Sequence, residues 1–196
     1  MATEFKYLVF SVFGISDFGK FTDAVIDLFD KELRLQKAKL LIEIPNFEEY
    51  INPKSGGAHM PKFCFWKNSM YPNKVFFISN YEDGLSNVCR AIQRRLKCSY
   101  VMCALSEGIK NPFYKFYYSN SFFEERLVQT YKDPQWVFYE EGTPLLIENT
   151  VYYRNRFIKD RLNNTIIKEY MLKLGVDISL IDTHIIDSLV FIRKKW

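Results

Sequence analysis

Apolar runs and amphipathic segments alternate along the first half of the chain. The runs are rich in β-branched and aromatic residues, and they predict buried strands at residues 6–13, 39–44, 74–79 and 99–105. Residues 22–35 and 85–96 lie between them and carry apolar side chains at helical spacing, which predicts two amphipathic helices. Thr22 is the expected cap of the first helix, and Asn80 or Asp83 that of the second. The pattern indicates two strand–helix–strand units, and right-handed crossovers would make the two strands of each unit parallel.

The second half of the chain is richer in aromatic residues and turns. Turn residues at 133–135 and 141–144 separate short apolar runs. These runs predict an antiparallel meander with strands at residues 113–119, 126–132, 136–139 and 145–147. The pattern then predicts a basic helix at residues 150–162, a further helix at residues 163–174 and a last strand at residues 189–193. Asn163 is the expected cap of the second of these helices, and Gly175 is expected to end it.

These elements predict an α+β fold. The expected architecture is a mixed sheet from two β-α-β units, followed by an antiparallel aromatic-rich meander and C-terminal helices. The strands at residues 6–13, 74–79 and 99–105 are expected at its centre. The chain has 196 residues, which suits a single domain over residues 1–196, and no linker divides it. Aromatic residues make up 17% of the chain, so we expect a large core.

Residues 45–73 form the longest stretch without clear periodicity, apart from a short strand expected at 63–66. Loops of this length usually bind something or lie disordered. Gly56 and Gly57 would let backbone amides approach a phosphate, and His59 would act as an acid or a base. The sequence lacks the glycine patterns of phosphate and dinucleotide loops, so a plain flexible loop is favoured. An enzyme with a site around this loop is the alternative that these residues leave open.

The net charge is mildly positive, since 27 basic and 23 acidic residues give +4. This balance permits an anionic partner without requiring one. Basic residues cluster near aromatic ones, so arginines would hold a nucleic-acid backbone while rings stack on bases. Acidic residues interleave with these clusters, which favours solvated helix faces whose long stems cover apolar surface. A nucleic-acid-binding protein is therefore an alternative function, with the candidate contacts Arg94, Arg95, Arg154 and Arg156.

Catalysis and metal binding have no recognisable pattern in this sequence. A nucleophile elbow is absent, and the paired carboxylates are adjacent, so on a strand they would point to opposite faces. The cysteines stand at 64, 89, 98 and 103 without a Cys-x-x-Cys pair, and the two histidines are His59 and His184. We therefore expect free buried thiols, no metal, no cofactor and no enzymatic activity.

The expected location is the cytoplasm. The chain opens without a signal-peptide pattern. No apolar run approaches the roughly 18 residues that cross a bilayer, so we expect no contact with a membrane. Free thiols are also the usual state of cysteines in the reducing cytosol.

Consecutive aromatic residues at 113–118 and 122–123 exceed what a sheet with one wet face can bury. Either both faces of the sheet are covered, or some of these rings are exposed. Exposed rings are typical anchors of protein interfaces. The favoured function is a non-enzymatic protein-binding protein that contacts its partner through the 45–73 loop and the 113–123 segment. The candidate contact residues are Tyr114, Tyr117, Tyr118, Phe122 and His59.

The section from 131 to 177 carries a set of residues that resembles part of a known protein family. It contains Tyr131, the run 136–145, Glu148, Tyr152, Tyr153, the run 158–161, Tyr170, Leu174 and Gly175. This section, about a quarter of the chain, resembles the closing part of small cytosolic immunity-type proteins that accompany bacterial polymorphic toxins. The resemblance implies an immunity protein that neutralises a cognate effector toxin.

The matching residues of that section indicate a strand, a Gly-Pro turn and a capped helix. They are structural, so no toxin-contact residue is carried over from the family. Inhibitors of nucleases are often acidic, whereas this chain is basic, which implies an effector other than a nuclease.

Overall fold

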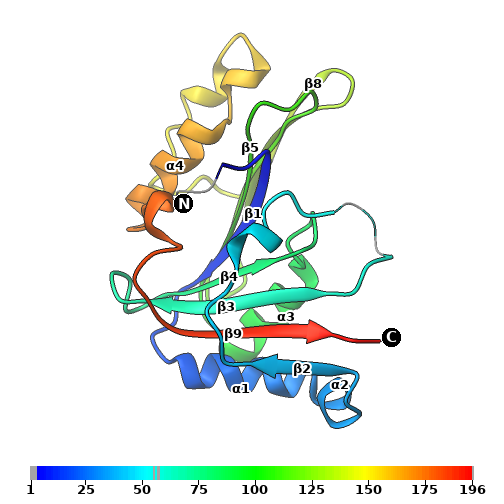
Figure 1. Ribbon diagram of the computed structural model, residues 1–196. Coiled ribbons are helices and arrows are strands. Elements are labelled where there is room, and N and C mark those ends of the chain that lie inside the picture. The colour runs from blue at the N-terminus through cyan, green and yellow to red at the C-terminus, as the bar shows by residue number, and fades with distance from the viewer. Residues whose placement is uncertain (1–3, 55, 57, 196) are drawn as a thin grey trace.

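The computed structural model describes residues 4–54, 56 and 58–195 (Figure 1). Within these residues, nine strands form one open sheet in the order β2-β9-β3-β4-β1-β5-β6-β7-β8. The strands are β1 (Tyr7–Phe13), β2 (Ala38–Leu41), β3 (Lys62–Asn68), β4 (Val75–Ser79), β5 (Tyr100–Ser106), β6 (Phe113–Ser119), β7 (Glu125–Lys132), β8 (Trp136–Glu141) and β9 (Ile185–Arg193). The helices are α1 (Phe18–Leu28), α2 (Asp30–Arg34), α3 (Ser86–Leu96) and α4 (Asn164–Lys173). Short 3₁₀ turns are η1 (Phe47–Glu49), η2 (Tyr152–Arg154), η3 (Ile158–Asp160) and η4 (Ile178–Leu180).

The α+β class is confirmed, but the expected mixed sheet is wrong, because every neighbouring pair of strands is antiparallel. The strands β4 and β5 flank α3 in sequence and do point the same way, but β1 lies between them. The strands β1 and β2 also point the same way, with β4, β3 and β9 between them. Each helical crossover therefore skips positions that other strands fill. The three strands expected at the centre, β4, β1 and β5, do lie there side by side.

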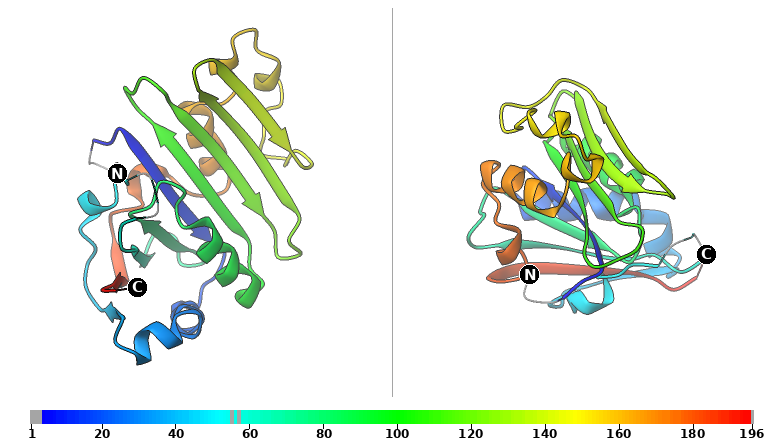
Figure 2. Two further views of the ribbon diagram at one scale, coloured as in Figure 1. Left: turned by 90° about the vertical axis from the view of Figure 1, so that its right-hand side faces the viewer. Right: turned by 90° about the horizontal axis from the view of Figure 1, so that it is seen from above.

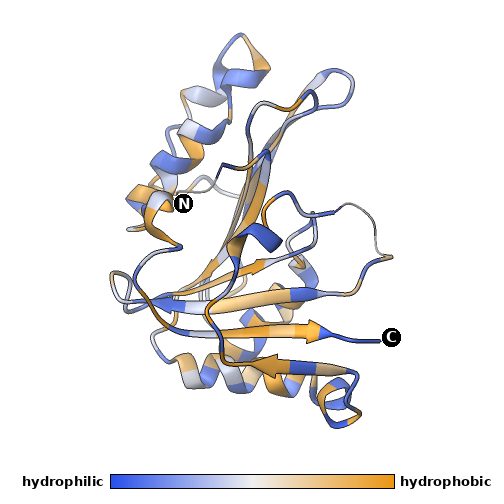
Figure 3. Ribbon diagram, viewed as in Figure 1, coloured by the Kyte–Doolittle hydropathy of each residue, from blue (hydrophilic) through white to orange (hydrophobic). Residues whose placement is uncertain are grey.

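Helical layers cover both faces of the central strands, which explains their continuous apolar runs. The helices α1 and α3 pack on one face, over a core that includes Phe13, Phe63 and Phe77. The helix α4 and the segment before β9 pack on the other face, over Trp66 and Phe116. The sheet twists strongly, since β3 and β9 run across the view of Figure 1 while β1 and β5 rise steeply. Figure 3 shows hydrophobic residues along the strands that lie between these layers.

The first helix begins one turn earlier than the sequence predicts. The carboxylate of Asp17 accepts a hydrogen bond from Lys20 N at 2.9 Å, so Asp17 is the cap. Thr22 lies inside α1, where its hydroxyl donates to Phe18 O at 2.9 Å. The predicted single helix is also divided at Phe29, which separates α1 from α2.

The predicted caps differ in outcome between the helices α3 and α4. Leu85 precedes α3 with a φ of +52° and gives no side-chain cap, although Asp83 accepts from Leu85 N at 3.0 Å. The predicted helix near the C-terminus is confirmed as α4. Asn163 caps it by accepting from Ile166 N at 3.2 Å, and Gly175 follows it with a φ of +75°.

Three other predictions need correction. Residues 150–162 form the turns η2 and η3 instead of a basic helix. Residues 145–147 form no strand, because Leu145 N donates to the Glu148 carboxylate at 2.9 Å rather than to a neighbouring strand. The irregular segment 45–73 is shorter than expected, since it contains η1 and the whole of β3, which pairs with both β4 and β9.

Candidate functional site

One face of the sheet lies uncovered over β6, β7 and β8. The helices α1 and α3 pack over the neighbouring strands of the same face, and the left view of Figure 2 shows β6 to β8 with no helix in front of them. The side chains of this face stand in rows, because directly opposed residues of antiparallel strands share a face. We call this surface the open face, and its residues are Phe113, Lys115, Gln129, Tyr131, Val137 and Tyr139.

A pocket of about 590 Å³ lies where the open face meets β1 and β5. Ala104 of β5 stands opposite Val9 on one side and Lys115 on the other. Its methyl group is much shorter than either neighbour, so the row is hollow at Ala104. In the next row Tyr7 and Phe113 close the end of the pocket, with ring centroids 6.5 Å apart. A hollow of this volume suits a small ligand or a few side chains of a partner.

The turn between β4 and α3 forms one wall of the pocket. Gly84 in this turn has a φ of +67°, a conformation that favours glycine. It also lies against the sheet, so that a Cβ at this position would come within 2.6 Å of Val9 Cγ1 and 3.1 Å of Met102 Cε. The wall can stand this close to the floor only because Gly84 has no side chain.

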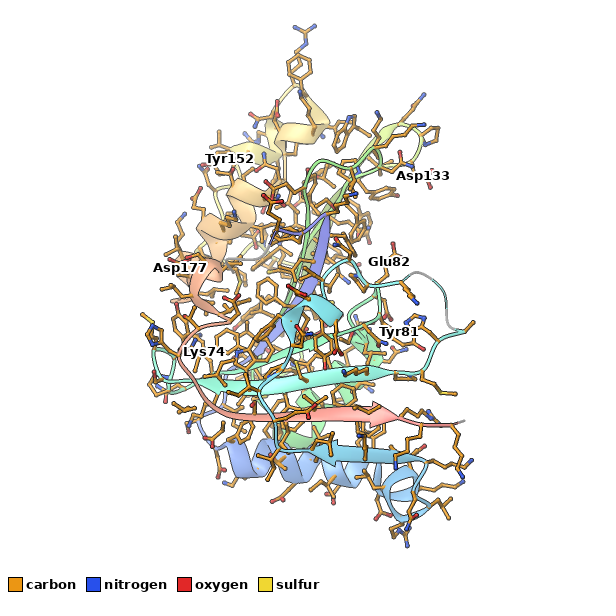
Figure 4. The ribbon with its side chains drawn as sticks, viewed as in Figure 1. Lys74, Tyr81, Glu82, Asp133, Tyr152 and Asp177 are labelled. Carbon is orange, nitrogen blue, oxygen red and sulfur yellow. The ribbon has the colours of Figure 1, made fainter. Side chains whose placement is uncertain are left out.

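The segment around residue 54 forms another part of the wall, beside the β4–α3 turn, and His59 holds it in place. The Tyr81 hydroxyl donates to His59 O at 2.5 Å, and the two rings lie 4.1 Å apart. Lys54 forms an isolated bridge with Tyr81. The His59 Nε2 atom also lies 3.0 Å from Asn80 O, so this ring positions the wall and does not line the pocket. Figure 4 shows Tyr81 and Glu82 close to this segment.

Two lysines line the pocket, Lys54 in the wall and Lys115 on the floor. The side chain of Lys115 is half-buried, and among the described residues no carboxylate oxygen lies within 4.0 Å of its Nζ atom. Burial lowers the pKa of Lys115 below its ordinary value, and nearby Arg90 lowers it further, while Asp83 acts in the opposite direction. The Nζ atom lies 5.7 Å from the centroid of the Tyr117 ring.

The rim of the pocket carries negative charge. Glu82 and Asp83 line it, and Asp83 is partly engaged by Leu85 N. Burial raises the pKa of Tyr7 well above its ordinary value, and both carboxylates add to the shift. The protonated Tyr7 hydroxyl donates to Glu82 O at 3.3 Å. The pocket thus has an apolar body, a cation on its floor and carboxylates at its edge, an arrangement suited to selective binding.

The aromatic residues predicted as partner contacts do not form one surface. Tyr117 is 3% exposed and packs in the core of the α1 and α3 face. Tyr114 and Tyr118 are half-buried against the core of the opposite face. Phe122 is 83% exposed at the tip of the β6–β7 hairpin. With His59 in the pocket wall, these five residues occupy four separate places.

The arginines predicted to contact nucleic acid also lie apart. Arg94 and Arg95 are exposed on α3, and Arg95 reaches Asp27 at 3.9 Å. Arg154 ends η2 and Arg156 follows it, in the layer on the other face of the sheet. Figure 1 shows the η2 region (yellow) at the top of the view and α3 well below it, so these arginines form no continuous stripe.

The sequence interpretation missed the residues of the pocket, above all Tyr7, Ala104 and Lys115. One signal was available. Lys115 is the sole charged residue of the aromatic strand β6, and its neighbours at 113 and 117 share its face. A lysine between aromatic residues on the same face of a strand is a signal that could have indicated a binding site. The hollow at Ala104 was not predictable, because it depends on which strands lie beside β5.

The section that resembles immunity-type proteins contributes a buried polar cluster. The side chains of Arg126 and Glu148 are 2% and 0% exposed, and Arg126 Nη2 lies 2.8 Å from Glu148 Oε2. The Tyr153 hydroxyl donates to the same carboxylate at 2.6 Å, and the Tyr170 hydroxyl donates to Tyr153 at 3.0 Å. These contacts join β7, η2 and α4, so the matching residues serve the fold.

Neither a group of three metal-ligating side chains nor a helix long and apolar enough to cross a membrane is found among the described residues. The four cysteines are free and buried. The chain matches no family model, no curated protein and no solved structure. The open face and its pocket are therefore the basis on which a function is proposed.

Proposed function

We propose that this chain is a non-enzymatic binding protein that takes another protein on its open face, as an immunity protein does when it neutralises a bacterial effector toxin. One observation carries the proposal: α1 and α3 cover the neighbouring strands on this face of the sheet, but leave β6 to β8 without a covering layer. An uncovered sheet face with aromatic side chains is typical of a protein interface.

The chemistry of the open face supports a protein partner. Tyr139 is 43% exposed, and Tyr131 and Val137 are half-buried beside it. Tyrosine is enriched at interface hot spots, because it offers a large apolar ring together with a hydroxyl, and the Tyr139 hydroxyl donates to Glu141 Oε2 at 2.8 Å. The rows of side chains on the open face continue into the pocket. A partner would therefore cover the open face and insert a side chain into the pocket. The free, buried cysteines suit a protein that works in a reducing compartment such as the cytoplasm.

Site-specific photo-crosslinking tests the proposal. A benzophenone amino acid would replace Gln129 or Tyr139 on the open face, and Phe157, which is 59% exposed in the opposite layer, would be the control position. In lysate of the native host, both open-face positions should crosslink to one and the same protein, while position 157 should not. Tyr139→Ala should weaken capture of that protein about tenfold or more.

Crosslinks from position 157 alone, or from no position, would contradict the proposal. Binding to nucleic acid is the competing outcome, and it is measured with mixed oligonucleotides. If it occurs, its affinity should fall steeply with salt and should depend on Arg94, Arg95, Arg154 and Arg156. The distance between these two pairs of arginines favours the protein partner instead.

An enzyme with a site at the 45–73 segment is the third reading, and one observation favours keeping it as a candidate. Lys54 and Gly56 of this segment do line the pocket, together with Lys115. An amine with a lowered pKa is a better nucleophile at neutral pH than an ordinary lysine. Turnover of a substrate by the wild type that is lost in Lys115→Met would establish this candidate in place of the binding protein.

A further inference from the structure

We infer that the pocket is a carboxylate-binding subsite, in which Lys115 receives an acidic side chain of the partner protein. The inference rests on the proposed function and adds the chemistry of the contact. The pocket opens onto the face that the partner would cover, and the strand register places Lys115 between Ala104 in the pocket and Gln129 on the open face. A side chain that enters from the open face therefore meets Lys115.

The charges around Lys115 call for an anion from outside the chain. A half-buried ammonium group is costly unless it is paired, and no carboxylate of the described residues lies within 4.0 Å of it. Arg90, whose charge acts on Lys115, is directed at Glu125 with an N–O distance of 3.6 Å and at the Tyr117 ring. The pKa of Lys115 is lowered by burial and by Arg90, and an incoming carboxylate would offset both effects.

The remaining walls select the kind of anion. Val9, Met102 and Phe113 give the pocket an apolar body, which suits the methylene groups of an acidic side chain or a neighbouring apolar group. Glu82 and Asp83 line the same pocket and offset the charges of Lys54 and Lys115, so a ligand with two negative charges meets more repulsion than a ligand with one. A single carboxylate is therefore favoured over a phosphate group. The same repulsion disfavours a nucleic-acid backbone at this place.

The first experiment uses hydrocinnamate, an aromatic ring joined to a carboxylate by two methylene groups, and its neutral amide. Binding is followed by heteronuclear NMR of the labelled protein. The acid should bind wild-type protein about tenfold more tightly than the amide, since a charge-assisted hydrogen bond forms with the acid alone. Benzylphosphonate, which approaches two negative charges, should bind more weakly than hydrocinnamate. Shifts should centre on the amides of β5 and β6 that border Ala104.

Lys115→Met should bind acid and amide equally and should remain folded, because the substitution replaces a desolvated charge with an apolar chain of similar length. Lys110→Met is the matched control: it removes the same charge at an exposed position between β5 and β6, and should keep the preference for the acid. Equal binding of acid and amide to the wild type would overturn the inference. A preference that persists in Lys115→Met would overturn it as well.

The second experiment distinguishes the source of the carboxylate. Saturating hydrocinnamate should reduce crosslinking of the captured protein from position 129, because both ligands need Lys115. If hydrocinnamate binds but does not reduce crosslinking, the subsite serves a free small carboxylate, which refutes the side-chain assignment and leaves the protein interface standing. If the subsite fails the first experiment, the crosslinks from the open face still decide the proposed function by themselves.

Discussion

Arg126 and Glu148 form a buried ion pair that joins the sheet to the segment after β8. Arg126 Nε lies 3.0 Å from Glu148 Oε1, and Nη2 lies 2.8 Å from Oε2. The Nη1 atom donates to the backbone oxygens of Glu141 and Gly142, so one guanidinium group holds both the end of β8 and the segment that follows. Glu140 binds the same guanidinium group from the solvent side, where its side chain is 41% exposed.

This geometry predicts very different costs for two similar substitutions. Glu148→Ala should lower the free energy of unfolding by about 3–5 kcal/mol, because it leaves Arg126 buried without its main partner. Glu140→Ala removes an exposed partner and should cost about 1 kcal/mol or less. Urea denaturation of the two variants measures both values. Equal costs would show that the buried carboxylate of Glu148 stabilises the fold no more than the exposed carboxylate of Glu140.

Two aromatic residues in the 113–123 segment differ in exposure, so their substitution should differ greatly in its cost to stability. Tyr117→Ala should destabilise the protein by about 3–5 kcal/mol, since the ring is 3% exposed and packs against Tyr100 with centroids 5.5 Å apart. Phe122→Ala should change stability by about 0.5 kcal/mol or less, because the ring is 83% exposed. Thermal unfolding of both variants provides the comparison. A stable Tyr117→Ala protein would place this ring outside the core.

The pocket wall should depend on the glycine at position 84. Gly84→Ala should destabilise the protein by about 2 kcal/mol or more, since the methyl group meets Val9 and the backbone is left-handed. It should also weaken hydrocinnamate binding, because the wall must move away from the floor. Gly108→Ala is the matched control: this residue is also left-handed, with a φ of +65°, but nothing lies within 4 Å of the new methyl group. Its cost should be about 1 kcal/mol, with hydrocinnamate binding unchanged.

Buried thiols and phenols predict that the protein loses stability at alkaline pH. Burial raises the pKa of Cys98 to about 11 and that of Cys89 to about 12, from an ordinary value of 9.0. Above pH 9.0 the unfolded chain releases these protons while the folded chain keeps them, so stability falls as the pH rises towards 11 and 12. Lys115 acts in the opposite sense, because its folded pKa is lowered and the folded chain releases this proton at a lower pH than the unfolded chain does. The raised pKa of Tyr7 adds to the loss.

Denaturation in urea with a reducing agent, from about pH 8 to about pH 11, measures this dependence, and each buried thiol should contribute a slope of up to about 1.4 kcal/mol per pH unit. Cys89→Ala should have a shallower slope than the wild type, since one of the titrating groups is removed. A stability that stays flat over this range would contradict the burial of these groups.

Elements with local causes were predictable from the sequence. The apolar runs became β1, β4 and β5, and these lie together at the centre of the sheet. The helix α4 begins after Asn163 and is followed by Gly175 as predicted, because a side-chain cap and a left-handed glycine act within one turn of the chain. Local capping was a weaker guide at Thr22, where the competing cap Asp17 is only one turn away.

The order of the strands in the sheet depends on long-range pairing. The position of the pocket depends on this order. A continuous apolar run indicates burial on both faces, but it is the same for parallel and antiparallel neighbours. The placement of β1 between β4 and β5 therefore had no local signal. The pocket follows from that placement, since Val9 of β1 is far in sequence from Ala104 and Lys115, which belong to the consecutive strands β5 and β6. Their common row exists because hydrogen bonds between strands fix the register, and this register leaves a small residue between two larger ones.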